Sequence, residues 1–337
     1  MNIKNSNKKT TIVFYSNATE LQKEVNLDTS TISFRSIGHN KPFPVYFDGK
    51  FGFLKDSTYT SKSVLDKYEY IICQLGKMLG IKMAETYKVY FDNNFAGIIS
   101  ESVLDNNTEK MFLAIDIDTL IQNPDKDLIA YINYIKQLYT TNNQVFHRTN
   151  GDTWNIPTID KDEDINTVIE LFPNLIKRLE SNPIKQNEII QDYYNMIMLD
   201  IITNNVDRNS NNYGLILDKD NHFRFAGLFD NSTTYIPGLP STKRRINGFM
   251  IDRDKLLTVL FKKHYHDIEN ITKSCSENKS ELIDYIRKLC NQNLEHDEAN
   301  TFLMPITQNL LTICNYQKTK EKGQVYKRYN REKESNR

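Results

Sequence analysis

The first hundred residues alternate hydrophobic and polar positions over short stretches, which is the pattern of half-buried strands. Strands are predicted at residues 31–34, 45–47, 51–55, 84–91 and 95–100. Between residues 64 and 79 apolar side chains recur instead at spacings of three and four, which predicts one amphipathic helix. Gly80 supplies a left-handed residue to end this helix. This part of the chain therefore predicts a sheet with one helix.

Helical periodicity dominates after residue 101. Helices are predicted at residues 127–139, 165–180, 184–203, 254–270, 279–292 and 297–314, with one strand pair at 213–217 and 223–229. We expect an α+β protein of two lobes, β-rich at residues 1–104 and mostly helical at residues 105–317. Residues 318–337 hold eight basic and three acidic side chains with few apolar ones, which predicts a basic, mobile tail.

Composition narrows the class of protein. The 337 residues include 43 basic and 43 acidic side chains, so a protein that binds nucleic acid by charge alone is not expected. Hydrophobic residues make up 39% of the chain, which is enough for a packed core. No apolar run reaches the roughly 18–20 residues that span a bilayer, and no signal peptide opens the sequence. A cytoplasmic location is the default expectation, and export without such a signal is left open.

Cysteine, histidine and aspartate spacing argues against three kinds of site. No C-x-x-C pair and no H-E-x-x-H motif occurs, so disulfide frameworks and zinc centres are not expected and the four cysteines are predicted to be buried thiols. The acidic run at residues 160–164 opens like a calcium-binding loop. It lacks the glycine and the glutamate that such a loop requires at later positions, so we expect a solvated acidic loop.

The segment 189–232 carries the most informative pattern, in which an apolar helix leads to a polar loop, a hairpin and an acid. Asp207 and Asn212 in the loop have the D-x-x-x-x-N spacing of a kinase catalytic loop, in which the Asp accepts the substrate proton and the Asn holds magnesium. A two-residue turn at Asp220-Asn221 would pair residue 212 with residue 229 and set Asp230 beside Asn212. The alternative is an Asx-rich turn that bonds to its own backbone.

The N-terminal lobe supplies a second candidate pair. Strand alternation places Lys55 on the same face as Phe51 and Phe53, so its ammonium extends from an apolar surface. Glu69 lies on the inward edge of the predicted helix, where it can pair with Lys55 and orient the lysine toward nucleotide phosphates. The alternative is two solvated charges on unrelated elements.

These motifs together resemble those of the HipA-like serine/threonine kinases, and in particular a short HipA-related type. The likeness covers residues 36–237 and lies in G-F-L-K at 52–55, E-Y at 69–70, N-V-D-R at 205–208, N-Y-G at 212–214 and L-F-D-N-S at 228–232. It implies a two-lobed kinase fold whose first lobe binds ATP. It also implies roles for five residues: Lys55 on the ATP phosphates, Glu69 as its partner, Asp207 as catalytic base, and Asn212 and Asp230 as Mg²⁺ ligands.

The chain departs from mainstream protein kinases at several points. There is no G-x-G-x-x-G, and the segment with Ser36 and Gly38 takes the position of the phosphate-covering loop. Asn231-Ser232 follows the metal aspartate instead of Phe-Gly. The segment 98–103, with Glu101 and Val103, is expected to contact adenine through its backbone. We expect the chain to be too short for the extra N-terminal module of longer HipA toxins, so an antitoxin-like partner is possible but not supported.

We therefore expect a Ser/Thr protein kinase that uses ATP and Mg²⁺, phosphorylates a protein substrate and modifies itself. A phosphoinositide or small-molecule kinase with the same D-R-x-x-x-N loop is one alternative, and a nucleotide-binding pseudokinase or scaffold is another. Lys243, Arg244 and Arg245 follow Asp230 by thirteen to fifteen residues and are candidates for binding an acidic acceptor or a phosphorylated side chain. A solvated basic loop is the alternative there.

Overall fold

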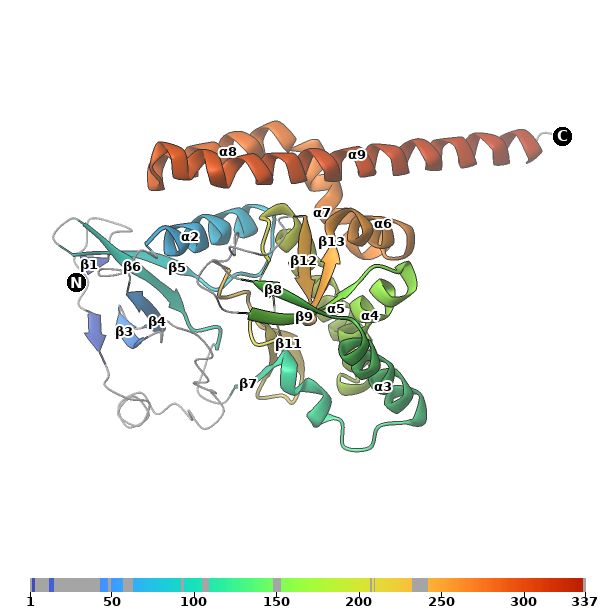
Figure 1. Ribbon diagram of the computed structural model, residues 1–337, viewed down its shortest axis with the longest axis horizontal. Helices are drawn as coiled ribbons and strands as arrows, with labels where there is room; N and C mark the ends of the chain where they lie inside the picture. The colour runs from blue at the N-terminus through green and yellow to red at the C-terminus, as the bar shows by residue number, and fades with distance from the viewer. Residues whose placement is uncertain are drawn as a thin grey trace.

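The structure is a computed structural model that describes residues 2–3, 12–14, 43–47, 50–56, 63–91, 94–104, 109–147, 153–206, 208, 210–231 and 242–335. Figure 1 shows a β-rich lobe beside a mostly helical lobe, with α8 lying over α2 and the long helix α9 running across both lobes. The predicted α+β class with two lobes is confirmed. The division near residue 104 stays a prediction.

The N-terminal lobe is an antiparallel sheet in the order β1-β5-β6-β4-β3-β2. Its strands are Asn2–Ile3 (β1), Ile12–Phe14 (β2), Phe43–Phe47 (β3), Lys50–Asp56 (β4), Thr86–Phe91 (β5) and Asn94–Glu101 (β6). Helix α2 (Ser63–Met78) matches the predicted helix, and Gly80 follows it at φ +73°. Four predicted strands are confirmed, and the one at residues 31–34 lies outside the described residues.

The C-terminal lobe is built from helices that the sequence pattern largely anticipates. They are α3 (Lys126–Thr141), α4 (Asp162–Leu179), α5 (Pro183–Ile202), α6 (Arg253–Lys263), α7 (Tyr265–Glu277), α8 (Lys279–Asn293) and α9 (His296–Ser335). The single helix predicted at 254–270 was wrong, because His264 separates α6 from α7. Its buried ring bonds to Tyr194 at 2.8 Å and to Asn166 at 2.8 Å, contacts that apolar periodicity does not reveal.

Two small sheets complete this lobe. One has the order β11-β10-β7, with β7 (Lys110–Leu113), β10 (Gly214–Leu217) and β11 (Phe223–Phe225). The other has the order β12-β13-β9-β8, with β8 (Asn143–His147), β9 (Thr153–Ile159), β12 (Lys243–Ile246) and β13 (Phe249–Asp252). The expectation of one strand pair was therefore wrong. Strands such as β8 (N-Q-V-F-H) and β12 (K-R-R-I) contain too few apolar residues to show alternation.

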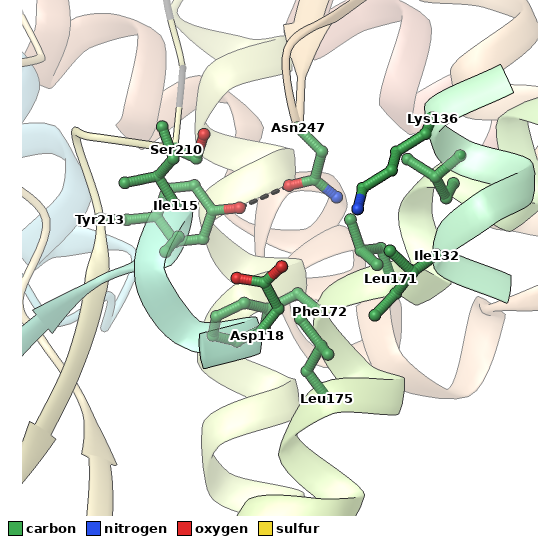
Figure 2. A pocket seen from close by; sticks show the side chains of 12 residues that line it. Ile115, Asp118, Ile132, Lys136, Leu171, Phe172, Leu175, Ser210, Tyr213 and Asn247 are labelled. Carbon is green, nitrogen blue, oxygen red and sulfur yellow. Dashed lines mark hydrogen bonds between the residues drawn. The ribbon is translucent and has the colours of Figure 1, made fainter. Parts of the chain in front are cut away.

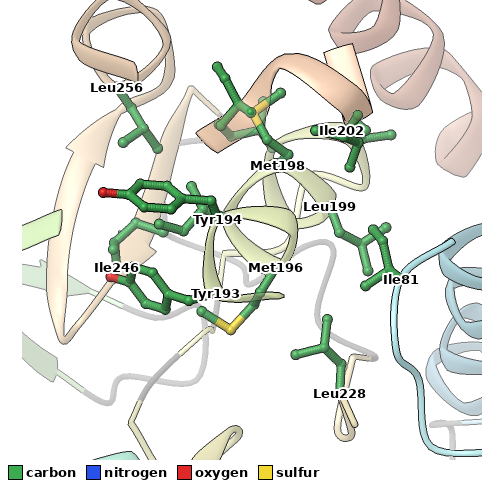
Figure 3. Packing of buried hydrophobic residues seen from close by; sticks show 14 of the residues in the cluster. Ile81, Tyr193, Tyr194, Met196, Met198, Leu199, Ile202, Leu228, Ile246 and Leu256 are labelled. Carbon is green, nitrogen blue, oxygen red and sulfur yellow. The ribbon is translucent and has the colours of Figure 1, made fainter. Parts of the chain in front are cut away.

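Helix α5 forms the centre of the core. From Ile189 to Ile202 nearly every side chain is buried, so this helix is surrounded on all sides. Figure 3 shows Leu228 and Ile81 beside it on one flank and Ile246 on another. All four cysteines are buried and free, as predicted. Because Ile81 follows α2 and Leu228 precedes Asp230, the core joins the two lobes next to the candidate site.

Helices α8 and α9 cover the outer face of α2 (Figure 1). The Tyr68 ring on α2 stacks on the Phe302 ring of α9 with centroids 4.4 Å apart. Beyond this contact α9 packs against α7 and α5, with Ile306, Leu310 and Ile313 buried, and only its C-terminal end extends away from the body to Ser335. The segment expected as a mobile tail is thus helical through Ser335, and its mobility stays a prediction. Within the described part of the chain, no helix is long and apolar enough to cross a membrane.

Candidate active site

Lys55 and Glu69 meet as the sequence predicts. The Lys55 Nζ donates to Glu69 Oε2 at 2.5 Å, and the Ser100 hydroxyl donates to Glu69 Oε1 at 3.3 Å. The Glu69 side chain is only 2% exposed, whereas that of Lys55 is 17% exposed. Because Glu69 is buried and also bonded to Ser100 of β6, it gives the Lys55 side chain a fixed direction. The interpretation of Lys55 and Glu69 as two unrelated solvated charges is therefore wrong.

Lys55 also reaches the other lobe. Its ammonium donates to Asp230 Oδ1 at 2.9 Å, and the Asp230 side chain remains 49% exposed. Burial lowers the pKa of Lys55, but the charges of Asp230 and Glu69 outweigh it and hold that pKa above its ordinary value. The charge of Lys55 in turn holds the pKa of Asp230 below its ordinary value. Both groups are therefore charged at neutral pH, beside open space.

The hairpin that was expected to position Asp230 has a different register. Leu215 pairs with Phe225 and Leu217 with Phe223, so the register is one residue off the pairing of 212 with 229. The loop has three residues, 219–221, because Asn221 adopts a left-handed φ of +61° and Asp218 Oδ1 accepts from the Asp220 and His222 N–H groups. Strand β11 also ends at Phe225. The predicted pairing of residues 212 and 229 was wrong.

A contact between the lobes places Asp230 instead. Leu228 forms a parallel bridge with Met83, in which the Leu228 N–H donates to the Lys82 carbonyl and the Ala84 N–H donates to the Leu228 carbonyl, both at 2.9 Å. Two residues later, Asp230 adopts a left-handed φ of +53°. The segment that leads from α2 to β5 thereby fixes the chain immediately before the aspartate.

Arg208 connects the polar loop with the Asp230 segment. Its guanidinium is buried and makes two bonds to Asp200, from Nε at 2.9 Å and from Nη2 at 3.0 Å. Its Nη1 donates to the Asn212 carbonyl at 3.0 Å and to the Phe229 carbonyl at 3.3 Å, and Nη2 donates to Asn231 Oδ1 at 2.5 Å. Burial lowers the pKa of Arg208, and the Asp200 charge more than compensates, so the guanidinium stays charged.

Asn212 and Asp230 offer an amide oxygen and a carboxylate, which are hard donors of the kind that Mg²⁺ prefers. Among the described residues no group of three or more His, Cys, Asp or Glu side chains forms a metal site, and magnesium beside a nucleotide does not require one. The half-exposed Asp230 carboxylate fits this use. Gly214 is needed close by, since a Cβ there would lie 2.1 Å from the Phe112 carbonyl oxygen of β7.

The segment predicted to contact adenine is tied into the sheet. The Glu101 carboxylate accepts from Lys50 and from the Tyr87 hydroxyl, each at 2.8 Å. The Glu101 N–H donates to the Glu85 carbonyl at 2.7 Å, so this amide is already in use. The Val103 carbonyl accepts from Arg224 of β11 at 3.0 Å. Adenine contact at Glu101 and Val103 stays a prediction.

The basic run after Asp230 does not form one surface. On strand β12 Arg244 is fully buried, while Lys243 and Arg245 are partly exposed on the opposite face. Burial and the nearby Arg253 lower the pKa of Arg244 to about 10. The prediction that all three cations bind an acceptor is therefore wrong for Arg244. Strand alternation points its side chain into the interior of the protein. A docking role for the other two stays a prediction.

Three predicted site residues lie outside the described residues. They are Asp207, Ser36 and Gly38. Arg208 and Val206, on either side of Asp207, are both buried. The roles assigned to these three residues are predictions from the sequence.

A cavity of about 190 Å³ lies in the C-terminal lobe (Figure 2), and neither Lys55 nor Asp230 lines it. It is lined from the 3₁₀ helix η1 (Ala114–Leu120), α3 and α4, and also by Ser210, Tyr213 and Asn247. The Ile115 N–H donates to the Ser210 carbonyl at 3.0 Å, so η1 backs the polar loop. This cavity is not the predicted nucleotide site, because the predicted site residues do not line it.

Comparison with known proteins places this fold. No family model matches the sequence, and no curated protein matches it. The crystal structure of the Helicobacter pylori proinflammatory kinase CtkA aligns over 84% of this chain and 92% of its own, with a TM-score of 0.53 and 12% identity. A chain in the Shewanella oneidensis MR-1 complex of HipA, HipB and operator DNA aligns over 92% of this chain and 73% of its own, with a TM-score of 0.50 and 14% identity.

The chain has a HipA-type, kinase-like fold. The resemblance predicted from short motifs is thus confirmed for the fold. Identities of 12% and 14% say nothing about the substrate, so the chemistry must be argued from the residues of this chain.

Sequence reasoning missed the residues that support the predicted site. Asp200, Asn231 and Ser100 hold the charged groups described above. Asp200 and Ser100 were not singled out, and Asn231 was noted only as part of a motif and without a role. One signal was present, because Asp200 interrupts the apolar run M-L-D-I-I at residues 198–202 of a buried helix. A carboxylate in such a run requires a cationic or hydrogen-bonding partner.

Proposed function

We propose that the protein is a Ser/Thr protein kinase of HipA-like type that depends on ATP and magnesium. The observation that carries this proposal is the position of Lys55, which bonds to both Glu69 and Asp230. These residues come from β4, from α2 and from the segment after β11, and the sequence motifs predicted all three as site residues. The kinase-like fold supports the same assignment.

Each residue has a chemical task in this proposal. Lys55, directed by Glu69, holds the nucleotide phosphates, and Asp230 and Asn212 hold magnesium. Magnesium, when bound, neutralises the negative charge of the phosphates. Asp207 orients the acceptor hydroxyl and accepts its proton while the acceptor oxygen bonds to the γ-phosphorus and the bond to ADP breaks. Positioning and charge neutralisation supply most of the rate in such a transfer.

The remaining parts of the proposal rest on sequence. Ser36 and Gly38 cover the phosphates, the segment 98–103 contacts adenine, and the enzyme modifies itself on Ser or Thr. The similar Shewanella oneidensis chain is in a complex with HipB and operator DNA, and we propose neither partner for this chain. The cytoplasmic location stays a prediction.

The test is phosphoryl transfer from radiolabelled ATP, with and without magnesium, alone and with cell lysate. We expect label on the wild-type protein or on a lysate protein, and a fall of at least ~10²-fold in Asp207→Ala and in Asp230→Ala. Asp230→Ala should also weaken magnesium-dependent nucleotide binding, whereas Asp207→Ala should retain it. Full transfer in either variant contradicts the assigned roles.

The same assay separates the alternatives when phosphoinositide vesicles are added as an acceptor. Label in lipid and none in protein would indicate a lipid kinase. Nucleotide binding without transfer to any acceptor, identical in wild type and Asp207→Ala, would indicate a pseudokinase. Glu188→Gln, an exposed carboxylate on α5, serves as a control variant that should keep wild-type transfer.

A further inference from the structure

The Arg208 guanidinium bonds to the chain on both sides of Asp230. It donates to the Phe229 carbonyl at 3.3 Å and to the Asn231 side chain at 2.5 Å. It also donates to the carbonyl of Asn212, the second proposed metal ligand, at 3.0 Å. One planar group therefore connects the two segments that carry the ligands, although they are eighteen residues apart in the sequence.

The backbone of Asp230 needs such support. Its φ of +53° lies in the left-handed region, which is unfavourable for an L-residue, although aspartate tolerates it better than most. A residue stays in this conformation only when its neighbours are fixed. Arg208 fixes residues 229 and 231, and the Leu228 bridge to Met83 fixes the chain before them.

Asp200 orients the arginine from helix α5. The two carboxylate oxygens accept from Nε and Nη2 of Arg208, and both side chains are 1% exposed. The Asn205 side chain donates to Asp200 Oδ1 at 2.9 Å and fixes the carboxylate in turn. A bidentate pair leaves the guanidinium plane one orientation, so its remaining N–H groups point in set directions.

We propose that Arg208, oriented by Asp200, is a positioning residue that holds Asn212 and Asp230 in the arrangement that binds magnesium with the nucleotide. This inference rests on the proposed function, because it assumes that these two residues are the ligands. The Arg208 side chain is only 1% exposed, so it would touch neither nucleotide nor acceptor. Its effect passes through the backbone of Asn212 and through the residues flanking Asp230.

A purely structural role would have a different signature. Buried ion pairs often add little net stability, and loss of one partner destabilises the fold as a whole. That loss would lower the unfolding temperature without singling out the metal. Positioning predicts a selective loss of the metal-dependent part of nucleotide binding.

The variant to test is Arg208→Lys, which keeps the charge and loses the planar fork of donors. Nucleotide affinity is measured by calorimetric titration with ATP in EDTA and at saturating Mg²⁺, and the ratio of the two dissociation constants is compared. We expect the gain in affinity from Mg²⁺ to shrink by at least ~10-fold, as it does when residues that orient metal ligands are removed. The affinity in EDTA should change by less than ~2-fold.

Arg253→Lys is the matched control, because Arg253 also bonds to side chains of this lobe, to Asn309 at 2.7 Å in a partly buried contact and to Asp254 at 2.9 Å in an exposed one. The unfolding temperature should fall in both variants, and the gain in ATP affinity from Mg²⁺ should fall only in Arg208→Lys. If Arg208→Lys does not fold, Asn231→Ala tests the proposal instead, since it removes only the bond from Arg208 to Asn231 and leaves the Arg208–Asp200 pair intact. There the Mg²⁺ gain should fall at least ~3-fold.

The possible outcomes separate this inference from the proposed function. A wild-type Mg²⁺ gain in the folded Arg208→Lys protein, or in Asn231→Ala, overturns the positioning role and leaves the proposed kinase in place. A wild-type protein that binds no ATP with or without Mg²⁺ overturns both. Equal losses in Arg208→Lys and Arg253→Lys would assign Arg208 to the fold alone.

Discussion

Two cations approach the segment 229–231 from opposite lobes, and their surroundings differ. Lys55 comes from the N-terminal sheet and bonds to Glu69 and to Asp230, whose side chain is 49% exposed. Arg208 comes from the polar loop of the C-terminal lobe and bonds to Asp200, with both side chains 1% exposed. Both are ion pairs, but the one at Lys55 and Asp230 is open to solvent and the one at Arg208 and Asp200 is sealed in the interior.

The difference assigns different tasks to the two pairs. A sealed pair cannot exchange a partner for a ligand, because neither charge can be left unpaired in the interior. An open pair can, because an incoming phosphate and metal can replace the contact between Lys55 and Asp230. The open cation is therefore suited to bind, and the sealed cation is suited to hold the backbone in place.

Of the variants that test this comparison between cations, those of the open cation Lys55 and its partner Glu69 should have the largest effect. Lys55→Met and Glu69→Gln should each lower phosphoryl transfer by ~10-fold or more, since Glu69 acts chiefly by directing Lys55. The double variant should lose little more than Lys55→Met alone. Rates for the wild type, both single variants and the double variant complete the double-mutant cycle.

Additive losses in that cycle would mean that Lys55 and Glu69 act separately. A Glu69→Gln protein with normal rates would reduce the buried carboxylate to a structural group. Ser100→Ala provides a milder variant, because it removes only the 3.3 Å bond to Glu69 and leaves the ion pair intact.

Smaller effects on stability and on KM are expected on strand β12, where Arg244 is buried and Lys243 and Arg245 are partly exposed. Arg244→Ala should lower the free energy of unfolding by at least about 1 kcal/mol through lost packing, with an unchanged KM for the protein substrate. Lys243→Ala with Arg245→Ala should leave stability within about 0.5 kcal/mol and raise that KM. Denaturant unfolding and steady-state kinetics distinguish the two sets. An unchanged KM in the second set would leave Lys243 and Arg245 as surface charge.

Local patterns predicted much of the fold. The α2 helix, its end at Gly80 and most of the C-terminal helices follow from periodicity and helix-end signals within a few residues of each element. Strands β7, β8, β9, β12 and β13 did not, because they are partly polar, and β7 pairs with β10 and β9 with β13 over a long sequence separation. Hairpins β8–β9 and β12–β13 are local, and the Asn-Gly turn signal at residues 247–248 was missed. Long-range pairing is information that a local pattern does not contain.

The candidate site likewise has residues that local patterns predicted and one whose position they did not predict. Lys55 and Glu69 were predicted because strand alternation and the helix stripe each determine which face a side chain occupies. The position of Asp230 was assigned by a hairpin register that the three-residue loop at 219–221 shifts by one. The interactions that do place it, the Leu228–Met83 bridge and Arg208, join segments 145 and 21 residues apart, respectively.

The smallest expected effect tests a sealed carboxylate away from the cleft. Glu180, between α4 and α5, is 2% exposed and accepts from the Phe223 N–H at 2.7 Å and the Asn182 N–H at 2.8 Å. Burial raises its pKa, but these bonds and His222 outweigh burial, so the pKa lies below its ordinary value. The stability that Glu180 contributes is therefore present above its unfolded pKa of about 4.3 and is lost as pH falls through the lower folded value.

Glu180→Gln should consequently be less stable than wild type by about 1–2 kcal/mol at pH 7, and the difference should shrink as the pH falls below about 4. Thermal unfolding of both proteins between pH 3 and 8 measures it. Glu188→Gln, exposed on α5, should stay within about 0.5 kcal/mol of wild type throughout. If the Glu180→Gln difference were constant with pH, the carboxylate charge would not be what stabilises this turn. The loss would then come from the bond geometry that an amide cannot reproduce.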